Sequence, residues 1–215
     1  MNKKNIIKII DILENEYQEV KCTLNYNSPL ELLIATMLSA QCTDARVNIV
    51  TPRLFEKYKN SKEFMNADIY ELENFIRSTG FFRNKSNNIK KCCSTIVNNF
   101  HGDIPDNMND LVKLPGVGRK TANVFLGEIH TKPGIVVDTH TKRLANRIGL
   151  TNESNPEKIE QDLMKKIPEE KWTAFSHRLV YHGRAICNAR SPKCELCSIK
   201  EYCEYYKKLH QKRHT

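Results

Sequence analysis

Residues 111–122 have the sequence LVKLPGVGRKTA, in which a helix end, a glycine-rich turn and the start of a second helix follow one another. Pro115 stops the first helix, and Gly116 and Gly118 mark the turn. Because glycine has no Cβ, its main-chain N–H can approach a phosphate closely at a helix N-terminus. The pattern leaves two interpretations open: a phosphate clamp, or an ordinary turn whose glycines serve only its conformation.

Lys120 lies in the first turn of the second predicted helix, directly after the glycines. The positive end of the helix dipole disfavours an ammonium there, which favours a neutral amine. Such an amine can displace a base at the C1′ atom of a sugar and form a Schiff base, after which β-elimination breaks the bond to the 3′ phosphate. The alternatives are a solvated surface lysine and a simple phosphate contact.

A second candidate catalytic group is Asp138, in the sequence Val136-Val137-Asp138-Thr139-His140. It follows a short apolar run and precedes another predicted helix. A carboxylate at this place serves chemistry or caps the helix. Spacing alone does not choose between the two.

Four cysteines near the C-terminus are spaced as C-x6-C-x2-C-x5-C, at Cys187, Cys194, Cys197 and Cys203. Four thiolates at such close spacing indicate a metal site, either zinc or a 4Fe–4S cluster, and a pair of disulfides is the alternative. Basic residues lie in and before the loop between the first two cysteines, namely Arg184, Arg190 and Lys193. They predict contacts to phosphates.

The rest of the chain has helical periodicity and almost no strand alternation, which predicts an all-α fold. The pattern is clear at Leu30, Leu33, Ile34, Met37 and Leu38. Before it, Ser28-Pro29-Leu30-Glu31 predicts a helix start with a capping box. Cys92 and Cys93 lie on the apolar face of another such pattern, so we expect them in the core.

Charge and composition narrow the choice of partner and compartment. A net charge of +9 at pH 7 favours a polyanionic partner such as nucleic acid. The longest apolar stretch, residues 30–40, is shorter than the roughly 20 residues that span a bilayer. Acidic residues at Asp11, Glu14 and Glu16 interrupt the basic N-terminus before a signal-peptide core forms. We therefore expect a cytoplasmic chain without a membrane segment.

Taken together, these residues resemble the endonuclease III family of the helix-hairpin-helix glycosylase superfamily. The resemblance covers nearly the whole chain, through LSAQCTD at 38–44, LPGVGRKTANV at 114–124, VDTH at 137–140, HGR at 182–184 and the four cysteines. It implies an all-α protein of two lobes with DNA bound in the cleft between them. One lobe is a helical barrel at 22–132 that carries the hairpin; the other is discontinuous, from 1–21 and 133–215, with a 4Fe–4S loop at 187–203.

The resemblance also implies an activity: a bifunctional N-glycosylase and abasic-site lyase of base excision repair, which flips an oxidised pyrimidine out of the duplex. By position, Lys120 matches the nucleophile and Asp138 the catalytic carboxylate. Gln41 matches the residue that fills the gap in the helix, and Phe81 the wedge beside it. The implied cofactor is a 4Fe–4S cluster with a structural and DNA-docking role.

The expected partner is duplex DNA that contains a damaged pyrimidine or an abasic site, bound by a monomer at the nucleoid of a prokaryotic cytoplasm. The expected DNA contacts are Gln41, Phe81, Gly116, Gly118, Arg119, Arg184, Arg190 and Lys193. Gln41 by its own context is a solvated polar residue after an apolar helix, and the alternative for Phe81 is a core aromatic.

Two other functions compete with this one. Adenine-mismatch glycosylases are similar in sequence, but have serine at the place of Lys120 and a catalytic glutamate near Ala35. Lys120 therefore favours the bifunctional enzyme over a monofunctional, mismatch-specific glycosylase. The second alternative is a DNA-binding module without enzymatic activity, whose hairpin and basic loop only clamp phosphates.

Overall fold

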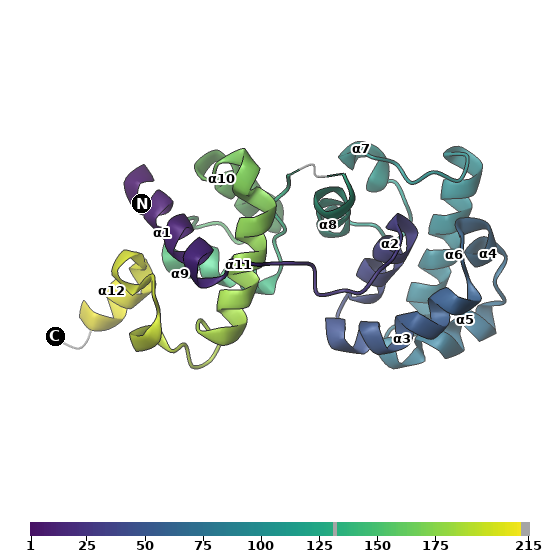
Figure 1. Ribbon diagram of the computed structural model, residues 1–215, viewed down its shortest axis with the longest axis horizontal. Helices are drawn as coiled ribbons and strands as arrows, with labels where there is room; N and C mark the ends of the chain where they lie inside the picture. Colours follow the sequence, from purple (N-terminus) through teal and green to yellow (C-terminus); the bar gives the residue numbers. More distant parts are fainter. Residues whose placement is uncertain (131–132, 212–215) are drawn as a thin grey trace. The chain divides into compact units, whose positions relative to one another are not determined.

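The structure, a computed structural model, describes residues 1–130 and 133–211. Every regular element in these ranges is a helix, which confirms the all-α prediction (Figure 1). The chain forms two compact units, Cys22–Lys132, and Met1–Lys21 with Pro133–Thr215. Each unit has its own apolar core. In the described ranges, no helix is both long and apolar enough to cross a membrane.

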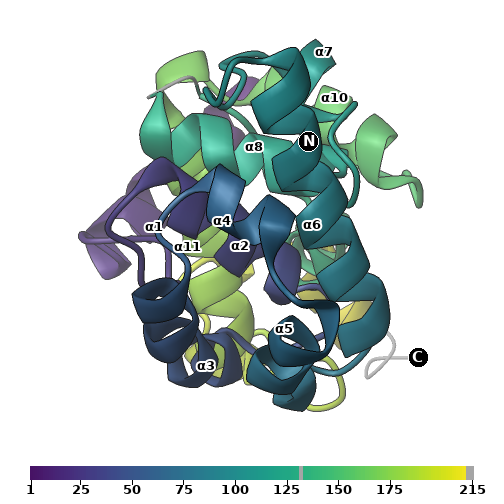
Figure 2. The same ribbon diagram turned by 90° about the vertical axis from the view of Figure 1, so that its right-hand side faces the viewer.

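The unit Cys22–Lys132 is built around one almost fully buried helix. Its elements are α2 (Pro29–Leu38), α3 (Asp44–Lys57), α4 (Ser61–Asn66), α5 (Ile69–Ile76), η1 (Arg77–Thr79), α6 (Phe82–Asn99), α7 (Met108–Leu111) and α8 (Arg119–Ile129). Helix α2 is buried from Leu32 to Leu38 and packs against α3, α6 and α8. Helices α4 and α5 cover α6 (Figure 2).

The start of α2 follows the predicted capping signal with one difference. The Ser28 hydroxyl accepts a hydrogen bond from the main-chain N–H of Glu31, as expected of an N-cap. The Glu31 carboxylate, however, accepts from the N–H of Asn27 at 2.7 Å, one residue before the cap. The predicted capping box is therefore wrong in its second bond, because Glu31 reaches past the cap residue.

The prediction of core positions for Cys92 and Cys93 is confirmed. Both lie on α6 and are buried in the core of the unit. Burial raises the pKa of the Cys92 thiol to about 12. These two cysteines therefore pack as small apolar side chains.

The other unit joins the first helix of the chain to its last third. Its elements are α1 (Lys3–Glu16), α9 (Thr139–Ile148), α10 (Pro156–Lys166), η2 (Glu169–Lys171), α11 (Trp172–Ala185), η3 (Cys194–Leu196), η4 (Lys200–Tyr202) and α12 (Glu204–Gln211). Ile9 and Leu13 of α1 are fully buried in one core with Leu144 and Phe175. Burial of each such side chain stabilises the fold by about 1.5–3 kcal/mol.

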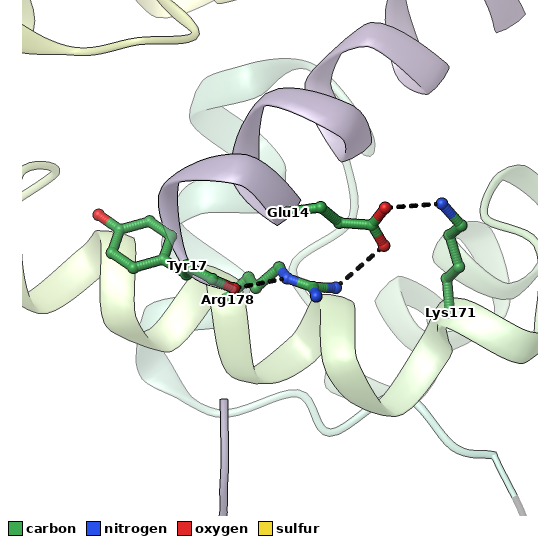
Figure 3. A network of polar contacts seen from close by, with 4 residues as sticks. All are labelled: Glu14, Tyr17, Lys171 and Arg178. Carbon is green, nitrogen blue, oxygen red and sulfur yellow. Dashed lines mark hydrogen bonds and ion pairs between the residues drawn. The ribbon is translucent and has the colours of Figure 1, made fainter. Parts of the chain in front are cut away.

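Charged side chains fix α1 in register on α11 (Figure 3). The Glu14 carboxylate accepts from Lys171 at 2.8 Å and from Arg178 at 3.1 Å. Arg178, which is buried, also donates to the main-chain carbonyl of Tyr17. Because that carbonyl lies directly after the end of α1, the contacts hold the C-terminal end of this helix.

Candidate functional site

The glycine turn joins α7 to α8 and approaches two other helices at Gly116. This residue has a φ of +79°, in the left-handed region that side chains disfavour. A Cβ built there would lie 2.8 Å from the Cβ of Asn88 on α6 and 2.9 Å from the Cε of Met37 on α2. Both the conformation and the space require glycine. The close approach seats the hairpin on α2 and α6.

Gly118 differs from Gly116, because nothing in the protein requires a glycine there. It is the N-cap of α8 with a φ of −90°, and a Cβ on it would meet no atom within 4 Å. A glycine also offers no side chain to cap the N–H groups of the first turn, which have no acceptor within the helix. The space that Gly118 leaves open therefore faces main-chain donors, the arrangement that binds phosphate.

Lys120 is the second residue of α8 and its side chain is exposed. The buried side of the helix consists of other residues, among them Ala122 and Phe125. No acidic residue lies in the first turn to pair with its amine. The lysine therefore lies one helical turn or less from the open N–H groups and is accessible to a large substrate. Arg119, the first residue of α8, is exposed beside it.

Asp138 is half-buried and caps α9. Its Oδ1 accepts from the main-chain N–H of Thr141 at 2.7 Å, and this is the hydrogen bond it receives within the described part of the chain. The extended segment before it is fixed on α11, because the N–H of Val136 donates to the Ser176 hydroxyl at 3.1 Å. A cap and a catalyst are thus compatible: one carboxylate oxygen holds the helix and Oδ2 stays available.

His140, two residues after Asp138, has a structural contact. Its Nδ1 lies 3.1 Å from a guanidinium nitrogen of Arg143, which also donates to the carbonyl of Gly183 at 3.0 Å. Burial lowers the pKa of the His140 imidazole.

The two candidate catalytic residues come from different units of the chain. Lys120 belongs to the unit Cys22–Lys132 and Asp138 to the other unit.

Gln41 and Phe81 occupy two exposed turns with the same unusual backbone conformation. Their φ angles are +53° and +48°, although neither is a glycine. The Phe81 side chain is 63% exposed, so the alternative of a core aromatic is wrong. The next residue, Phe82, packs against the core of the unit instead.

Two arginines that the sequence patterns did not single out lie over the ring of Phe82, the residue that follows Phe81. The guanidinium carbons of Arg77 and Arg83 are 5.6 and 5.7 Å from the centroid of the Phe82 ring. They place positive charge on the residue that directly follows the wedge candidate Phe81. Arg83 could have been selected as the basic neighbour of two phenylalanines, whereas Arg77 reaches the ring from the preceding turn and carries no sequence signal.

The four C-terminal cysteines line one cavity, together with Ile186, Pro192, Tyr205 and Tyr206 among other residues. All four are free thiols, so the disulfide alternative is wrong. Within residues 1–130 and 133–211, no three His, Cys, Asp or Glu side chains converge as ligands of a single metal ion. Four thiols around one cavity are the donor set that an iron–sulfur cluster takes from a protein.

Burial makes three of these thiols, those of Cys194, Cys197 and Cys203, poor acids in the absence of a cation. It raises the pKa of Cys197 to about 12 and raises the pKa of Cys194 and Cys203 as well. Only the thiolate is a ligand, so loading with a metal cluster must displace protons from the site.

Arg147 and Arg143 of α9 hold the loop of the first cysteine. Arg147 donates to the carbonyls of Asn188 and Ala189 at 2.8 and 2.7 Å, and its guanidinium lies 3.4 Å from the Cys187 sulfur. Arg143 donates to the Cys187 carbonyl. The sequence carries no signal for the roles of these two arginines, since their partners lie about 40 residues further along the chain.

The predicted basic residues of this region are all on the surface. Arg184 is exposed near the end of α11, and Arg190 and Lys193 are exposed in the loop between Cys187 and Cys194. The loop therefore presents positive charge while its main chain is anchored from beneath by arginines.

The chain is similar to known proteins over nearly its whole length. It matches the family model of the HhH-GPD superfamily base excision DNA repair proteins over residues 34–169, and that of the iron-sulfur binding domain of endonuclease III over 187–203. Endonuclease III of Synechocystis sp. is 48% identical over 202 residues, which are 94% of this chain and 92% of that protein.

Two solved structures are similar in fold and sequence. One is a trapped endonuclease III–DNA covalent intermediate in an estranged-adenine complex, and the other is a non-covalent endonuclease III–DNA complex. Each has a TM-score of 0.93 and 42% identity, and covers 98% of this chain and 99% of the solved one.

We expect substitution of the two hairpin glycines to affect different properties, folding stability at Gly116 and DNA binding at Gly118. Gly116→Ala should lower the free energy of unfolding by about 1–3 kcal/mol, because a Cβ there is strained and meets Asn88. Gly118→Ala should cost less than about 1 kcal/mol, but should weaken binding to duplex DNA by roughly tenfold, since its methyl group covers main-chain donors to phosphate.

Urea denaturation and fluorescence anisotropy with a labelled duplex measure the two effects. Equal DNA affinity of the Gly118→Ala variant and the wild type would contradict a phosphate clamp at this turn.

Proposed function

The chain belongs to the endonuclease III family of the HhH-GPD superfamily, and on this premise we propose that it removes oxidised pyrimidines from duplex DNA with Lys120 as nucleophile. It is a DNA glycosylase and abasic-site lyase of base excision repair. Family membership overturns the alternative of a DNA-binding module without enzymatic activity. The observation that carries the proposal is the exposed Lys120 directly after the open N-terminus of α8.

Binding begins with phosphates in this proposal. The first turn of α8 offers main-chain N–H groups, with Arg119 beside them, to one phosphate of the backbone. Arg184, Arg190 and Lys193 contact other phosphates and make affinity dependent on salt. None of these contacts reads the bases, so they hold undamaged and damaged DNA alike.

The exposed turns at Gln41 and Phe81 then act on the bases. Extrusion of a nucleotide costs a few kcal/mol, less for a damaged base, and leaves a gap in the stack. Phe81 inserts as an aromatic wedge, which can regain about 1–3 kcal/mol by stacking. Gln41 fills the gap with an amide that donates and accepts hydrogen bonds. Arg77 and Arg83 attract the flanking phosphates.

The chemistry of the proposal starts with attack by the Lys120 side chain. Its Nζ forms a bond to C1′ of the extruded nucleotide while the bond from C1′ to the base breaks, and the base leaves with the electron pair and a proton. The Asp138 carboxylate stabilises the positive charge that develops on the sugar. It then accepts, through Oδ2, the proton that the attached amine loses and passes it to the departing base. Opening of the sugar ring gives a Schiff base between C1′ and Nζ.

Strand cleavage follows from the same intermediate. The Schiff base acidifies the C2′ hydrogen; its loss expels the 3′ phosphate as the C3′–O bond breaks, and water then hydrolyses the Schiff base and returns Lys120. The solved relative that was trapped as a covalent intermediate with DNA supports a covalent path. A serine in place of Lys120 would allow only base release.

The cofactor of the chain is a 4Fe–4S cluster, and we infer that Cys187, Cys194, Cys197 and Cys203 are its ligands. When bound, the cluster cross-links the C-terminal loop and takes no part in bond breaking. The loop between Cys187 and Cys194 is then held in a shape that presents Arg190 and Lys193 to DNA. In this proposal the protein acts as a monomer on damaged duplex DNA at the nucleoid of the cytoplasm.

Borohydride trapping tests the nucleophile. Reduction of the Schiff base should leave a stable covalent adduct between the wild type and a duplex with an oxidised pyrimidine, and Lys120→Gln should give neither adduct nor cleavage. Lys113→Gln is the matched control, because Lys113 is an exposed lysine of the same hairpin that pairs with Asp110. A Lys120→Gln protein that still nicks the strand contradicts the assignment.

The Asp138→Asn variant tests whether the Asp138 carboxylate acts in catalysis or only caps α9. Asparagine caps a helix as well as aspartate does, so stability should change by less than about 0.5 kcal/mol. Turnover should fall by roughly a hundredfold or more, because the amide accepts no proton. Asp138→Ser, which also caps without a carboxylate, should behave alike. Single-turnover kinetics and thermal unfolding decide; full activity in the asparagine variant would leave Asp138 a cap only.

Substitution of a proposed cluster ligand tests the cofactor site. Cys197→Ala should abolish the visible absorption and bound iron of the protein, and should lower its thermal stability through loss of the cross-link. Cys42→Ala, at a half-buried free thiol of the other unit, should keep both. Stoichiometric zinc in a colourless wild type would be incompatible with an iron–sulfur cluster.

A further inference from the structure

Lys85 is a buried lysine for which the catalytic scheme has no use. It lies in α6, and its side chain is buried with 7% exposure. Its Nζ donates to two main-chain carbonyls, those of Leu38 and Thr79, each at 2.8 Å. Burial lowers the pKa of this ammonium. A buried amine is costly unless it is well hydrogen-bonded, so a lysine at this place needs a reason.

The two carbonyls mark the ends of two separate elements. Leu38 is the last residue of α2, and Thr79 is the last residue of η1. The C-terminal carbonyls of a helix have no partner within it and attract a cation. Lys85 therefore satisfies groups that would otherwise be buried without a donor.

Both carbonyls lie just before the exposed turns. Gln41 is three residues after Leu38, and Phe81 is two residues after Thr79. The main-chain N–H of Lys85 also donates to the carbonyl of Phe81 at 3.0 Å. Lys85 thus contacts both turns. Its side chain binds the carbonyl before each turn, and its main-chain N–H binds the carbonyl of Phe81 itself.

We propose that Lys85 is the positioning residue that fixes the Gln41 turn and the Phe81 turn relative to each other, so that both side chains enter the duplex together. The inference rests on the proposed DNA contacts of these two residues. Lys85 touches neither DNA nor the reacting atoms in this arrangement. Its effect is on the extrusion of the nucleotide, and the attack of Lys120 on an accessible sugar does not need it.

Lys90 offers a matched control on the same helix. Its Nζ also donates to a main-chain carbonyl, that of Ala67 directly after α4, far in sequence from both turns. Lys85→Met and Lys90→Met each remove an ammonium and keep an unbranched side chain that is one atom shorter. The two variants differ in the contacts that are lost: those of Lys85 join α6 to the ends of α2 and η1, and that of Lys90 joins α6 to the end of α4.

The experiment compares strand cleavage at an abasic site in a duplex and in the same single strand, where no base pair needs to open. In Lys85→Met, the ratio of kcat/KM on duplex to that on single strand should fall roughly tenfold to a hundredfold, the effect of lost hydrogen bonds to a charged group. Lys90→Met should keep the wild-type ratio, with thermal unfolding measured for both. In a double-mutant cycle, Lys85→Met should have little further effect on the ratio in a Gln41→Ala, Phe81→Ala background.

An unchanged ratio in folded Lys85→Met overturns the positioning role while leaving the proposed function intact. A wild type that cleaves neither substrate overturns the proposed function and this inference with it. Should Lys85→Met not fold, Lys85→Gln, which keeps one neutral donor group, is measured in its place. A smaller fall of the ratio supports the inference, and a wild-type ratio in this variant overturns it.

Discussion

The close approach of main chain to helix at Gly116 is the constraint on which the arrangement of the unit Cys22–Lys132 depends. Because no Cβ intervenes, the hairpin rests directly on Met37 of α2 and Asn88 of α6. These are the two helices whose ends carry the Gln41 and Phe81 turns. Lys85 then joins those ends to each other. The turn proposed to bind phosphate, the proposed nucleophile Lys120 and the two side chains proposed to insert into DNA are thus parts of one packed unit.

In the unit that holds the cysteines, charged side chains attach two segments to the rest of the fold. Arg178 and Lys171 bind Glu14 and so attach the first helix, while Arg147 attaches the loop of the first cysteine through carbonyls. Arginine suits both tasks, since its planar group donates in several directions at once. The consequence is a loop whose main chain is held from within and whose own basic side chains remain on the surface.

The sequence predicted what depends on local pattern and missed what depends on distant partners. Helical periodicity predicted the all-α fold and the burial of Cys92, because a helix face is defined within a few turns. Lys85 and Arg147 carried no such signal: their partners lie up to 47 and 42 residues away, and only the folded chain brings them together. The second bond of the predicted capping box is wrong by one residue, since the Glu31 carboxylate accepts from the N–H of Asn27.

The positive φ angles of Gln41 and Phe81 have a cost in folding free energy. A non-glycine residue in this conformation costs about 1–2 kcal/mol. The two hydrogen bonds that Lys85 donates to carbonyls before the turns favour the main-chain path that leads into each turn. In return the side chains are held outward before DNA arrives. Ordering a free side chain on binding costs about 0.5–1.5 kcal/mol, and a turn that is already fixed pays this cost in folding and leaves more of the stacking energy for extrusion of the base.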